Sequence, residues 1–282
     1  MMIHRNKTLR FSRTPSLLRY SVLILTLIAL VAPMNFVLIT PGPATELFPK
    51  VLKVEKSASV KVYPVHGQLN LLTIYVTNPE SFVFGAEVLG CWMWGDCVVL
   101  PRSVMYEDGA TDQAEEKTGT KEMVQSQNLA LAAARDAISR KFPYIDTSKV
   151  KDSSVKVTLE NTGGPSGGVI FTLGLIDLLT PTDLLQGRTI AGTGTISADG
   201  KVGAIGGVTE KIIGAKKAGA SLLFVSRENC DELPAKVDGI SVIAINNIDQ
   251  AIDYLIAPYA GGKAKRKDLN SAGIQGCASV GA

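Results

Sequence analysis

A short glycine-rich loop places the strongest constraint on how this 282-residue chain folds. Residues 161–168 read Asn-Thr-Gly-Gly-Pro-Ser-Gly-Gly, and the apolar run Val169-Ile170-Phe171 follows at once. Glycine permits backbone conformations that other residues avoid, and proline is favoured in the first turn of a helix. The pattern therefore predicts a tight turn that leads into a buried helix over residues 169–179, with Ser166 exposed at its N-terminal end.

This position suits a serine nucleophile. Unpaired N–H groups and the positive end of the helix dipole stabilise negative charge at a helix N-terminus. The flexible backbone at residues 163–164 and 167–168 would offer N–H donors to the oxyanion that forms when Ser166 attacks a carbonyl carbon. The loop by itself supports a simple strand-to-helix turn, with Ser166 as an ordinary helix cap, equally well.

A serine nucleophile needs a base, and the chain holds only two histidines, His4 and His66. This shortage also disfavours a histidine-rich metal site, and no metal or cofactor is expected. The base is therefore sought among the lysines.

A helix over residues 208–218, at about 100° per residue, places one lysine on an apolar face. That lysine is Lys211, and its neighbours on the face are Val208, Ala215 and Ala218. The charged residues of the same helix that fall on the expected solvent side are Glu210, Lys216 and Lys217. Burial lowers the pKa of an ammonium group, as a base near neutral pH requires. A solvated Lys211 without a catalytic role is the alternative.

The N-terminal region predicts a membrane anchor. Residues 1–19 contain five basic residues and no acidic one, and residues 20–39 are almost wholly apolar. Twenty apolar residues in a helix are just long enough to cross a bilayer core of about 30 Å. The basic flank should stay in the cytoplasm, so the rest of the chain is expected outside it. A cleaved signal peptide is the alternative, which the length of the stretch and Pro33 after Ala32 disfavour.

The chain divides into four predicted regions. They are an anchor with its basic flank (1–40), a β-rich segment with a helix (41–150), a catalytic region (151–258) and a disordered basic tail (259–282). In the second region we expect strands over 59–63, 68–76 and, paired, 83–100, an exposed loop over 107–121, and a helix over 123–138. In the third we expect strands over 154–159, 221–225 and 240–245, a hairpin over 190–205, and helices over 169–179, 208–218 and 248–255.

The four cysteines fit an oxidising compartment without requiring one. Cys91 and Cys97 bracket five residues, which predicts a hairpin bridged by a disulfide, with two free buried thiols as a close alternative. Cys230 and Cys277 are expected to be unpaired. None of these spacings is typical of a zinc site.

Two blocks of sequence resemble the Lon-type peptidases. Residues 164–168, Gly-Pro-Ser-Gly-Gly, resemble the serine motif of that family. Residues 190–196, 200–202 and 205–211 resemble its lysine block, which residues 215–219 and 223–225 continue. The resemblance covers about residues 155–255. It implies an α+β Lon proteolytic-domain body with a mixed sheet, and a Ser–Lys dyad in which Ser166 is the nucleophile and Lys211 the base. The supporting residues that it implies are Gly164, Pro165, Gly167 and Thr193, of which Thr193 matches the threonine beside the catalytic lysine.

The anchor and the segments 41–43, 69–76 and 123–134 are similar to the membrane-anchored branch of the family, which lacks an ATPase. Members of that branch commonly carry a PDZ domain before the catalytic motif, whereas this chain passes from Ile138 to Val155 without room for one. The chain also has Gly163 where many Lon enzymes have Asp.

The leading hypothesis is an ATP-independent serine endopeptidase, attached to the membrane through residues 20–39 and acting on polypeptide substrates outside the cytoplasm. The net charge of +3 is too small to indicate a nucleic-acid partner, and assembly into a homo-oligomer stays open. One alternative is a non-catalytic envelope binding module that keeps the fold. Another is an enzyme that binds phosphate in its Gly-Ser loop, although the sequence has no G-x-x-x-x-G-K-[ST] motif.

Overall fold

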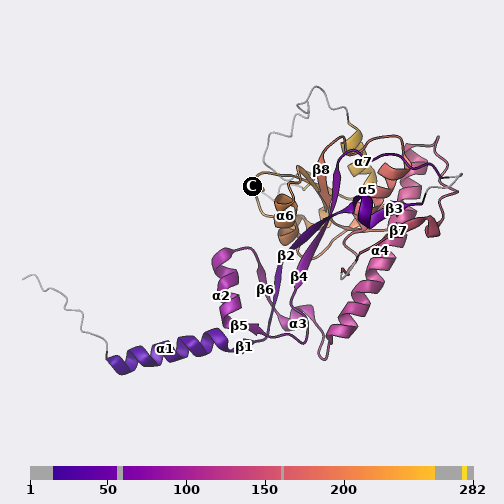
Figure 1. Cartoon of the computed structure of the whole chain (residues 1–282). Helices are drawn as coiled ribbons and strands as arrows, with labels where there is room; N and C mark the ends of the chain where they lie inside the picture. Colours follow the sequence, from indigo (N-terminus) through magenta and orange to yellow (C-terminus); the bar gives the residue numbers. More distant parts are fainter. Residues whose placement is uncertain (1–14, 56–59, 160–161, 258–274, 278–282) are drawn as a thin grey trace, which may run out of the picture.

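The computed structural model describes residues 15–55, 60–159, 162–257 and 275–277. Its centre is a six-stranded mixed sheet with the order β12-β11-β8-β4-β2-β6 (Figure 1). Neighbouring strands from β12 to β4 run parallel, and β2 pairs antiparallel with both β4 and β6. The strands are β2 (Phe36–Glu46), β4 (Gln68–Val76), β6 (Val98–Pro101), β8 (Thr189–Gly192), β11 (Leu222–Ser226) and β12 (Ser241–Ile245).

Three two-stranded ladders and several helices complete the fold. The ladders are β1 (Pro33–Met34) with β5 (Val83–Phe84), β3 (Leu52–Val54) with β7 (Val155–Val157), and β9 (Thr195–Ile196) with β10 (Val202–Gly203). The α-helices are α1 (Ser16–Val31), α2 (Gly85–Trp94), α3 (Arg102–Met105), α4 (Asp112–Lys141), α5 (Gly168–Leu179), α6 (Val208–Lys217) and α7 (Ile248–Ile256). Short helical turns are η1 (Leu47–Val51), η2 (Asp152–Ser154) and η3 (Arg227–Glu232).

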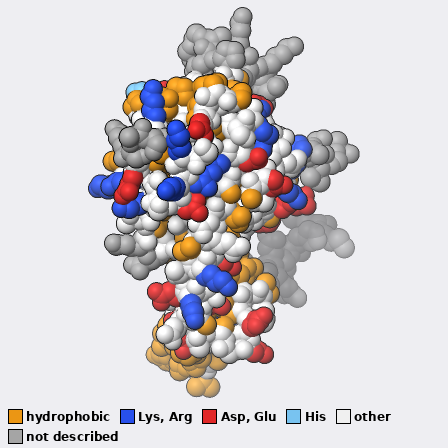
Figure 2. Space-filling view, turned by 90° about the vertical axis from the view of Figure 1, so that its right-hand side faces the viewer, with side chains coloured by type: hydrophobic (Ala, Val, Ile, Leu, Met, Phe, Trp, Pro, Cys, Tyr) orange, Lys and Arg blue, Asp and Glu red, His pale blue; other side chains and the backbone are white. Residues whose placement is uncertain are grey.

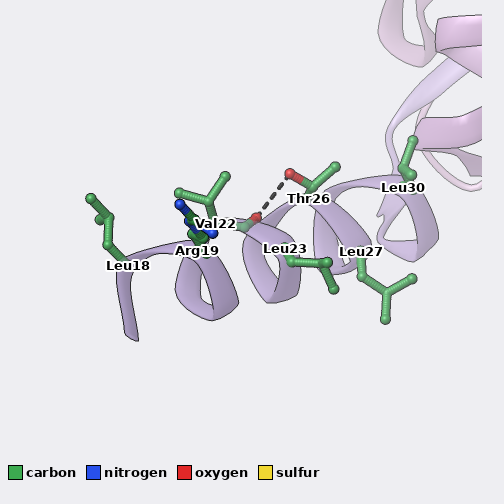
Figure 3. Close-up of a pocket in the computed structure, with 7 residues that line it drawn as sticks. All are labelled: Leu18, Arg19, Val22, Leu23, Thr26, Leu27 and Leu30. Carbon is green, nitrogen blue, oxygen red and sulfur yellow. Dashed lines mark hydrogen bonds between the residues drawn. The ribbon is translucent and has the colours of Figure 1, made fainter. Parts of the chain in front are cut away.

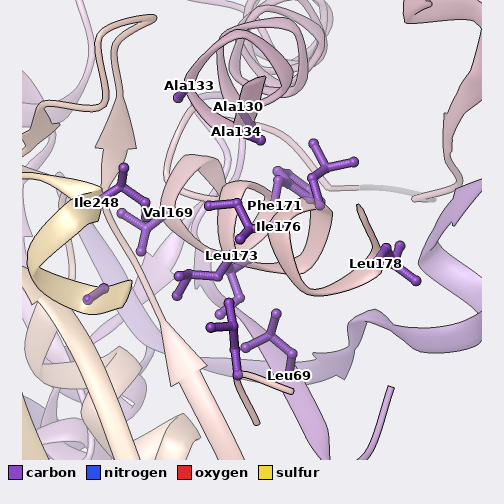
Figure 4. Packing of buried hydrophobic residues seen from close by; sticks show 14 of the residues in the cluster. Leu69, Ala130, Ala133, Ala134, Val169, Phe171, Leu173, Ile176, Leu178 and Ile248 are labelled. Atoms are coloured by element: carbon purple, nitrogen blue, oxygen red, sulfur yellow. The ribbon is translucent and has the colours of Figure 1, made fainter. Parts of the chain in front are cut away.

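Side chains that alternate along the strands build two hydrophobic layers, one on each face of the sheet. On β11, Leu222 and Phe224 join the layer that contains α5, whereas Leu223 and Val225 join the layer that contains α6. Helix α5 is buried on every side because α4 covers its outer face, where alanines of α4 lie over Phe171 and Ile176 (Figure 4). The predicted α+β body with a mixed sheet is confirmed.

The sheet draws its strands from both of the predicted regions that meet at residue 150. Strands β2, β4 and β6 come from residues 41–150 or just before them, and β8, β11 and β12 come from residues 151–258. Each set supplies the neighbours that the other needs, since β4 pairs directly with β8.

The predicted membrane span over residues 20–39 is wrong in extent. Helix α1 ends at Val31, and residues 36–39 form the start of β2, where Val37 and Ile39 are buried in the sheet. An apolar run can have the same composition in a membrane helix and in a buried strand. Hydropathy alone therefore could not separate helix α1 from the start of strand β2. Among the residues that the structure describes, none of the helices combines the length and the apolar character that crossing a bilayer requires.

Four other expected elements differ from the structure. Of the expected hairpin over 190–205, residues 189–192 form β8, which pairs parallel with β4 and β11 in the central sheet, and only the short strands β9 and β10 pair as a hairpin. Residues 83–100 contain helix α2 between short strands, because Glu87 caps the Phe84 N–H (2.8 Å) and starts a helix there. The expected loop over 107–121 holds the first third of α4, which begins at the capping hydroxyl of Thr111. Its polar residues are exposed, as on any solvated helix. Of the expected strand over 59–63, only Val60 among the described residues forms a bridge.

All four cysteines are paired. The Cys91–Cys97 disulfide is confirmed, but it links the last turn of α2 to the segment before β6 and not two hairpin strands. Cys230 and Cys277, which were expected to be unpaired, form a second disulfide across 47 positions. Gln275 pairs with the outer edge of β12, so part of the predicted disordered tail adds to the sheet. The rest of that tail lies outside the described residues.

Candidate active site

Ser166 lies in a tight turn directly before helix α5. The helix begins at Gly168 with Gly167 as its cap, so Ser166 is two residues outside the helix and not in its first turn. The side chain is half-buried. Gly164 has a φ of +88°, a conformation that side chains disfavour, which explains a glycine at this position. The loop therefore presents Ser166 at the positive end of a buried helix.

The segment that follows β8 holds the backbone of Ser166. The carbonyl oxygen of Ser166 accepts hydrogen bonds from the Gly194 N–H at 3.0 Å and from the Thr193 hydroxyl at 3.4 Å. Thr193 is fully buried, and its own N–H donates to the carbonyl oxygen of Phe224 on β11 at 2.9 Å. The structure thus brings Thr193 to Ser166 and ties both to the centre of the sheet.

Helix α4 holds the other side of the same turn. The Gly164 N–H donates to the Gly119 carbonyl oxygen at 2.9 Å, and the buried Ser126 hydroxyl donates to the Pro165 carbonyl oxygen at 3.0 Å. We did not predict either α4 residue from the sequence. An isolated glycine inside a helix often marks a position where another segment packs closely, and Gly119 is such a glycine. The signal was missed because the segment around Gly119 was expected to be a loop.

These contacts change which N–H groups can stabilise an oxyanion. The Gly164 N–H is bonded to α4, and the Gly168 N–H donates to the Pro165 carbonyl oxygen at 3.4 Å, so two of the expected donors are engaged. Within the described part of the chain, the N–H groups of Ser166 and Gly167 donate to no protein acceptor. They remain as the backbone donors beside the Ser166 hydroxyl.

Lys211 lies on the inner face of α6, as its helical position predicts. Only 3% of the residue is exposed, and this burial lowers the pKa of the ammonium group to about 8, against a smaller opposing effect of the Glu210 charge. Lys216 and Lys217 are exposed, as expected. The expectation of an exposed Glu210 is wrong: it is buried in the first turn of α6, and burial raises the pKa of its carboxyl group.

A buried amide fixes the chain just before α6. The side chain of Asn229, on η3, accepts from the Ile205 N–H at 3.1 Å and donates to the Ile205 carbonyl oxygen at 2.8 Å. Gly207 then turns the chain into the helix with a φ of +66°. Since Asn229 is fully buried and satisfies both backbone groups of Ile205, it sets where α6 begins and hence where Lys211 lies.

The two predicted catalytic elements reach the same part of β4 from opposite faces of the sheet. Gly167 packs beside Leu71, and Gly207 packs beside Ile74. Leu71 belongs to the hydrophobic layer of α5, whereas the neighbouring Leu72 belongs to the layer of α6. No hydrogen bond joins the Ser166 Oγ to the Lys211 Nζ among the contacts of the described residues. Catalytic hydrogen bonds are often long before substrate binds.

Comparison with known proteins gives a consistent result. Residues 103–258 match the family model of the Lon protease (S16) C-terminal proteolytic domain. The chain is 29% identical over 130 residues to Lon protease 2 of Bacillus subtilis, 33% over 140 residues to the Lon protease of Mesomycoplasma hyopneumoniae, and 30% over 166 residues to Lon protease 2 of Herpetosiphon aurantiacus. These matches cover 44%, 44% and 56% of this chain.

The same matches cover only 23%, 15% and 20% of those three relatives. The similarity therefore concerns one part of much longer proteins. The family match begins at Ser103, within α3, and ends at Pro258, so it includes α4 with Gly119 and Ser126 as well as the serine loop and α6. Because this match spans more than half of the chain, the protein belongs to the family of the Lon protease (S16) C-terminal proteolytic domain.

Proposed function

We propose that this protein is a serine endopeptidase that cleaves polypeptides with Ser166 as nucleophile and Lys211 as base. The observation that carries the proposal is the buried Lys211, whose pKa is lowered to about 8 at the position of the family's lysine motif. A base with a pKa near the working pH is the most effective one. Ser166 supports the proposal because its turn is fixed from two sides while its hydroxyl is left half-exposed.

In this mechanism the neutral amine of Lys211 removes the Ser166 hydroxyl proton while Oγ attacks the carbonyl carbon of the peptide bond. The oxyanion accepts hydrogen bonds from the N–H groups of Ser166 and Gly167, each worth about 3 kcal/mol in the transition state. The Lys211 ammonium then protonates the leaving amine as the C–N bond breaks. Water, deprotonated by Lys211, hydrolyses the acyl-enzyme and restores Ser166.

The proposed activity is independent of ATP, as in the branch without an ATPase that the N-terminal segments resemble, and its proposed substrates are extended or loosened polypeptide segments. We place the protein outside the cytoplasm and at a membrane surface. The two disulfides support an oxidising compartment. The basic N-terminal residues followed by the exposed apolar helix α1 support attachment to the membrane.

Cleavage of unfolded casein by the full chain, purified in mild detergent without ATP, tests the proposal. Ser166→Ala and Lys211→Met should each abolish cleavage. Lys216→Met is the matched control, because Lys216 is an exposed lysine of the same helix, and it should cleave at the parent rate. Cleavage that survives either catalytic substitution would exclude the dyad.

A second candidate is a non-catalytic module that binds unfolded polypeptide. Two observations favour it: the missing hydrogen bond between Ser166 and Lys211 among the described contacts, and the bond that occupies the Gly164 N–H. It predicts that the folded parent chain binds casein but cleaves it at no pH between 6 and 10, and that Ser166→Ala leaves the binding unchanged.

A further inference from the structure

Helix α2 carries an unusual apolar surface. Trp92 and Trp94 are 80% and 77% exposed, and Met93 between them is 64% exposed. Leu89 lies on the face of Trp92 and Met93, three and four residues before them. A soluble surface rarely exposes two tryptophans in one helical turn, because each ring presents a large apolar area to water. Trp94, two residues after Trp92, lies on the other side of the helix, over Gly90. Leu89, Trp92, Met93 and Trp94 together surround the C-terminal half of α2, and we call them the α2 surface.

The first turn of α2 contacts the end of helix α1, and the α2 surface lies at the other end of α2. Gly85, the first residue of α2, lies so close to the Ala29 carbonyl group that no side chain would fit between them. The chain that leaves α1 forms β1, which pairs with β5 directly before α2. The C-terminal end of α1 and the first turn of α2 therefore meet at one end of the molecule (Figure 1), where Figure 2 shows hydrophobic side chains gathered.

Helix α1 is itself apolar and unburied. Its leucines project from the helix and are not covered by other parts of the described chain (Figure 3). The Thr26 hydroxyl donates a hydrogen bond to the Val22 carbonyl oxygen of the same helix at 2.9 Å. None of its residues is buried. A helix of this kind is stable beside lipid, where its polar groups are satisfied internally.

Charge identifies the occupant of the exposed face of α1. Five basic and no acidic residues stand in positions 1–19, next to α1, which complements the anionic headgroups of a bilayer and not an apolar protein face. Tryptophan is enriched where hydrocarbon meets water because its ring is apolar and its indole N–H can bond to headgroups.

We propose that the α2 surface is a second membrane contact, in which Trp92 and Trp94 insert at the bilayer interface on the side where α1 leaves the sheet domain, and hold the sheet at a fixed orientation to the lipid. The inference rests on the membrane attachment stated under the proposed function, and it is independent of peptidase chemistry. The Cys91–Cys97 disulfide fixes the end of α2 that carries the tryptophans, so the surface is presented as one rigid unit.

The composition of the chain makes the test direct, because Trp92 and Trp94 are its only two tryptophans. The full chain is transferred from detergent to vesicles of phosphatidylcholine and phosphatidylglycerol, and the tryptophan emission is recorded with plain and with brominated lipids. We expect emission at shorter wavelength than in lipid-free buffer and loss of intensity with the brominated lipids. Trp92→Phe and Trp94→Phe report each ring separately.

A double variant tests the energetic contribution of the α2 surface. Trp92→Asp/Trp94→Asp should weaken partitioning into vesicles by about tenfold or more, since burying even one large apolar side chain is worth at least that factor. Tyr144→Asp, at an aromatic residue that is 70% exposed near the end of α4, should partition like the parent. Casein cleavage measured in detergent should be unchanged in both, because neither change touches Ser166, Lys211 or their supports.

Three results would overturn the proposal. The first is vesicle-bound protein whose emission stays that of water-exposed tryptophan and is not quenched by brominated lipid. The second is unchanged partitioning of the double variant. The third is short-wavelength emission before vesicles are added, together with a dimer in sedimentation, which would assign the α2 surface to a second copy of the chain. Failure of the parent chain to bind vesicles at all would instead refute the membrane attachment itself. The peptidase proposal is tested separately, by casein cleavage in detergent.

Discussion

Gly119 of helix α4 and Gly163 of the serine turn touch backbone to backbone. A Cβ atom on Gly163 would lie 3.0 Å from the Cα of Gly119, closer than such atoms normally approach. The contact lets the Gly164 N–H reach the Gly119 carbonyl oxygen at 2.9 Å. Gly163 is the position where the serine motif differs from many Lon enzymes, and this close approach gives the physical reason for a glycine there.

Gly163→Asp and Gly119→Ala should therefore disturb the serine turn. Each new Cβ forces the turn away from α4 and weakens the Gly164–Gly119 hydrogen bond, at a cost of about 1–3 kcal/mol. We expect casein cleavage to fall by about ten- to a hundredfold, with a lower Tm. Lys117→Ala, at an exposed residue of the same part of α4, is the control and should behave like the parent. Full activity of Gly163→Asp would contradict this explanation.

Ser126→Ala should act on the rate and not on substrate binding. The substitution leaves the Pro165 carbonyl oxygen without the 3.0 Å hydrogen bond from the buried hydroxyl, so the residue before the nucleophile is less firmly held. We expect kcat to fall several-fold or more with little change in KM, measured on a fluorogenic peptide. Ser139→Ala, at an exposed residue near the other end of α4, should change neither. A several-fold rise in KM with an unchanged kcat would instead assign Ser126 to substrate binding.

The pH dependence of cleavage should follow Lys211. Its neutral form is the base, and burial lowers its pKa to about 8, so kcat/KM should rise about tenfold between pH 7 and pH 9 and then level off. The Glu210 charge raises this pKa, so Glu210→Gln should move the midpoint to lower pH, whereas Lys216→Met should not move it. A rate independent of pH across this range would exclude Lys211 as the base.

A buried carboxyl group away from the candidate active site should make the stability of the fold depend on pH. Burial raises the pKa of Asp177, on α5, from 3.8 to about 6. The folded chain therefore holds more protons than the unfolded one between these values, and the stability that the neutral carboxyl contributes is lost as pH rises through about 6. This difference in pKa between the folded and the unfolded chain corresponds to about 3 kcal/mol of the free energy of unfolding.

Asp177→Asn removes this pH dependence. Its amide oxygen can still accept the hydrogen bond that the Leu184 N–H donates to the Asp177 carboxyl group at 2.8 Å. Its free energy of unfolding relative to the parent should thus rise by up to about 3 kcal/mol between pH 4 and pH 7, as measured by urea unfolding. The exposed Asp231→Asn provides the comparison and should show a flat difference. A flat difference for Asp177→Asn as well would show that the carboxyl is charged when folded.

The second disulfide should stabilise the edge of the sheet. Cys230→Ser releases the segment around Gln275 from the outer edge of β12, and a bridge across 47 positions typically contributes about 2–4 kcal/mol. We expect a lower Tm and faster proteolysis near the C-terminus. Cys91→Ser opens a separation of only 6 positions and should cost less. An equal Tm for both variants would contradict a closure effect.

Local pattern was sufficient wherever neighbours along the chain decide the structure. Helix α6 follows from its own period, and the same period placed Lys211 on the inner face because small and branched apolar residues surround it. Helix α5 and the strands β11 and β12 were predictable for the same reason, whereas the expected hairpin over 190–205 missed that β8 pairs with β4 and β11. Glu210 is the exception, since its burial depends on what packs against the first turn of the helix.

Contacts between distant segments were decided by the tertiary structure alone. The sequence by itself determined the α+β class, the serine turn and the buried lysine, because a glycine-rich turn and a helical period are local properties. Only the fold decided that residues 36–39 enter a sheet and not a bilayer, that Cys230 meets Cys277, and that Gly119 supports Gly163. Apolar residues are equally suited to lipid and to a protein core, and a pairing across many residues depends on the whole path of the chain between them.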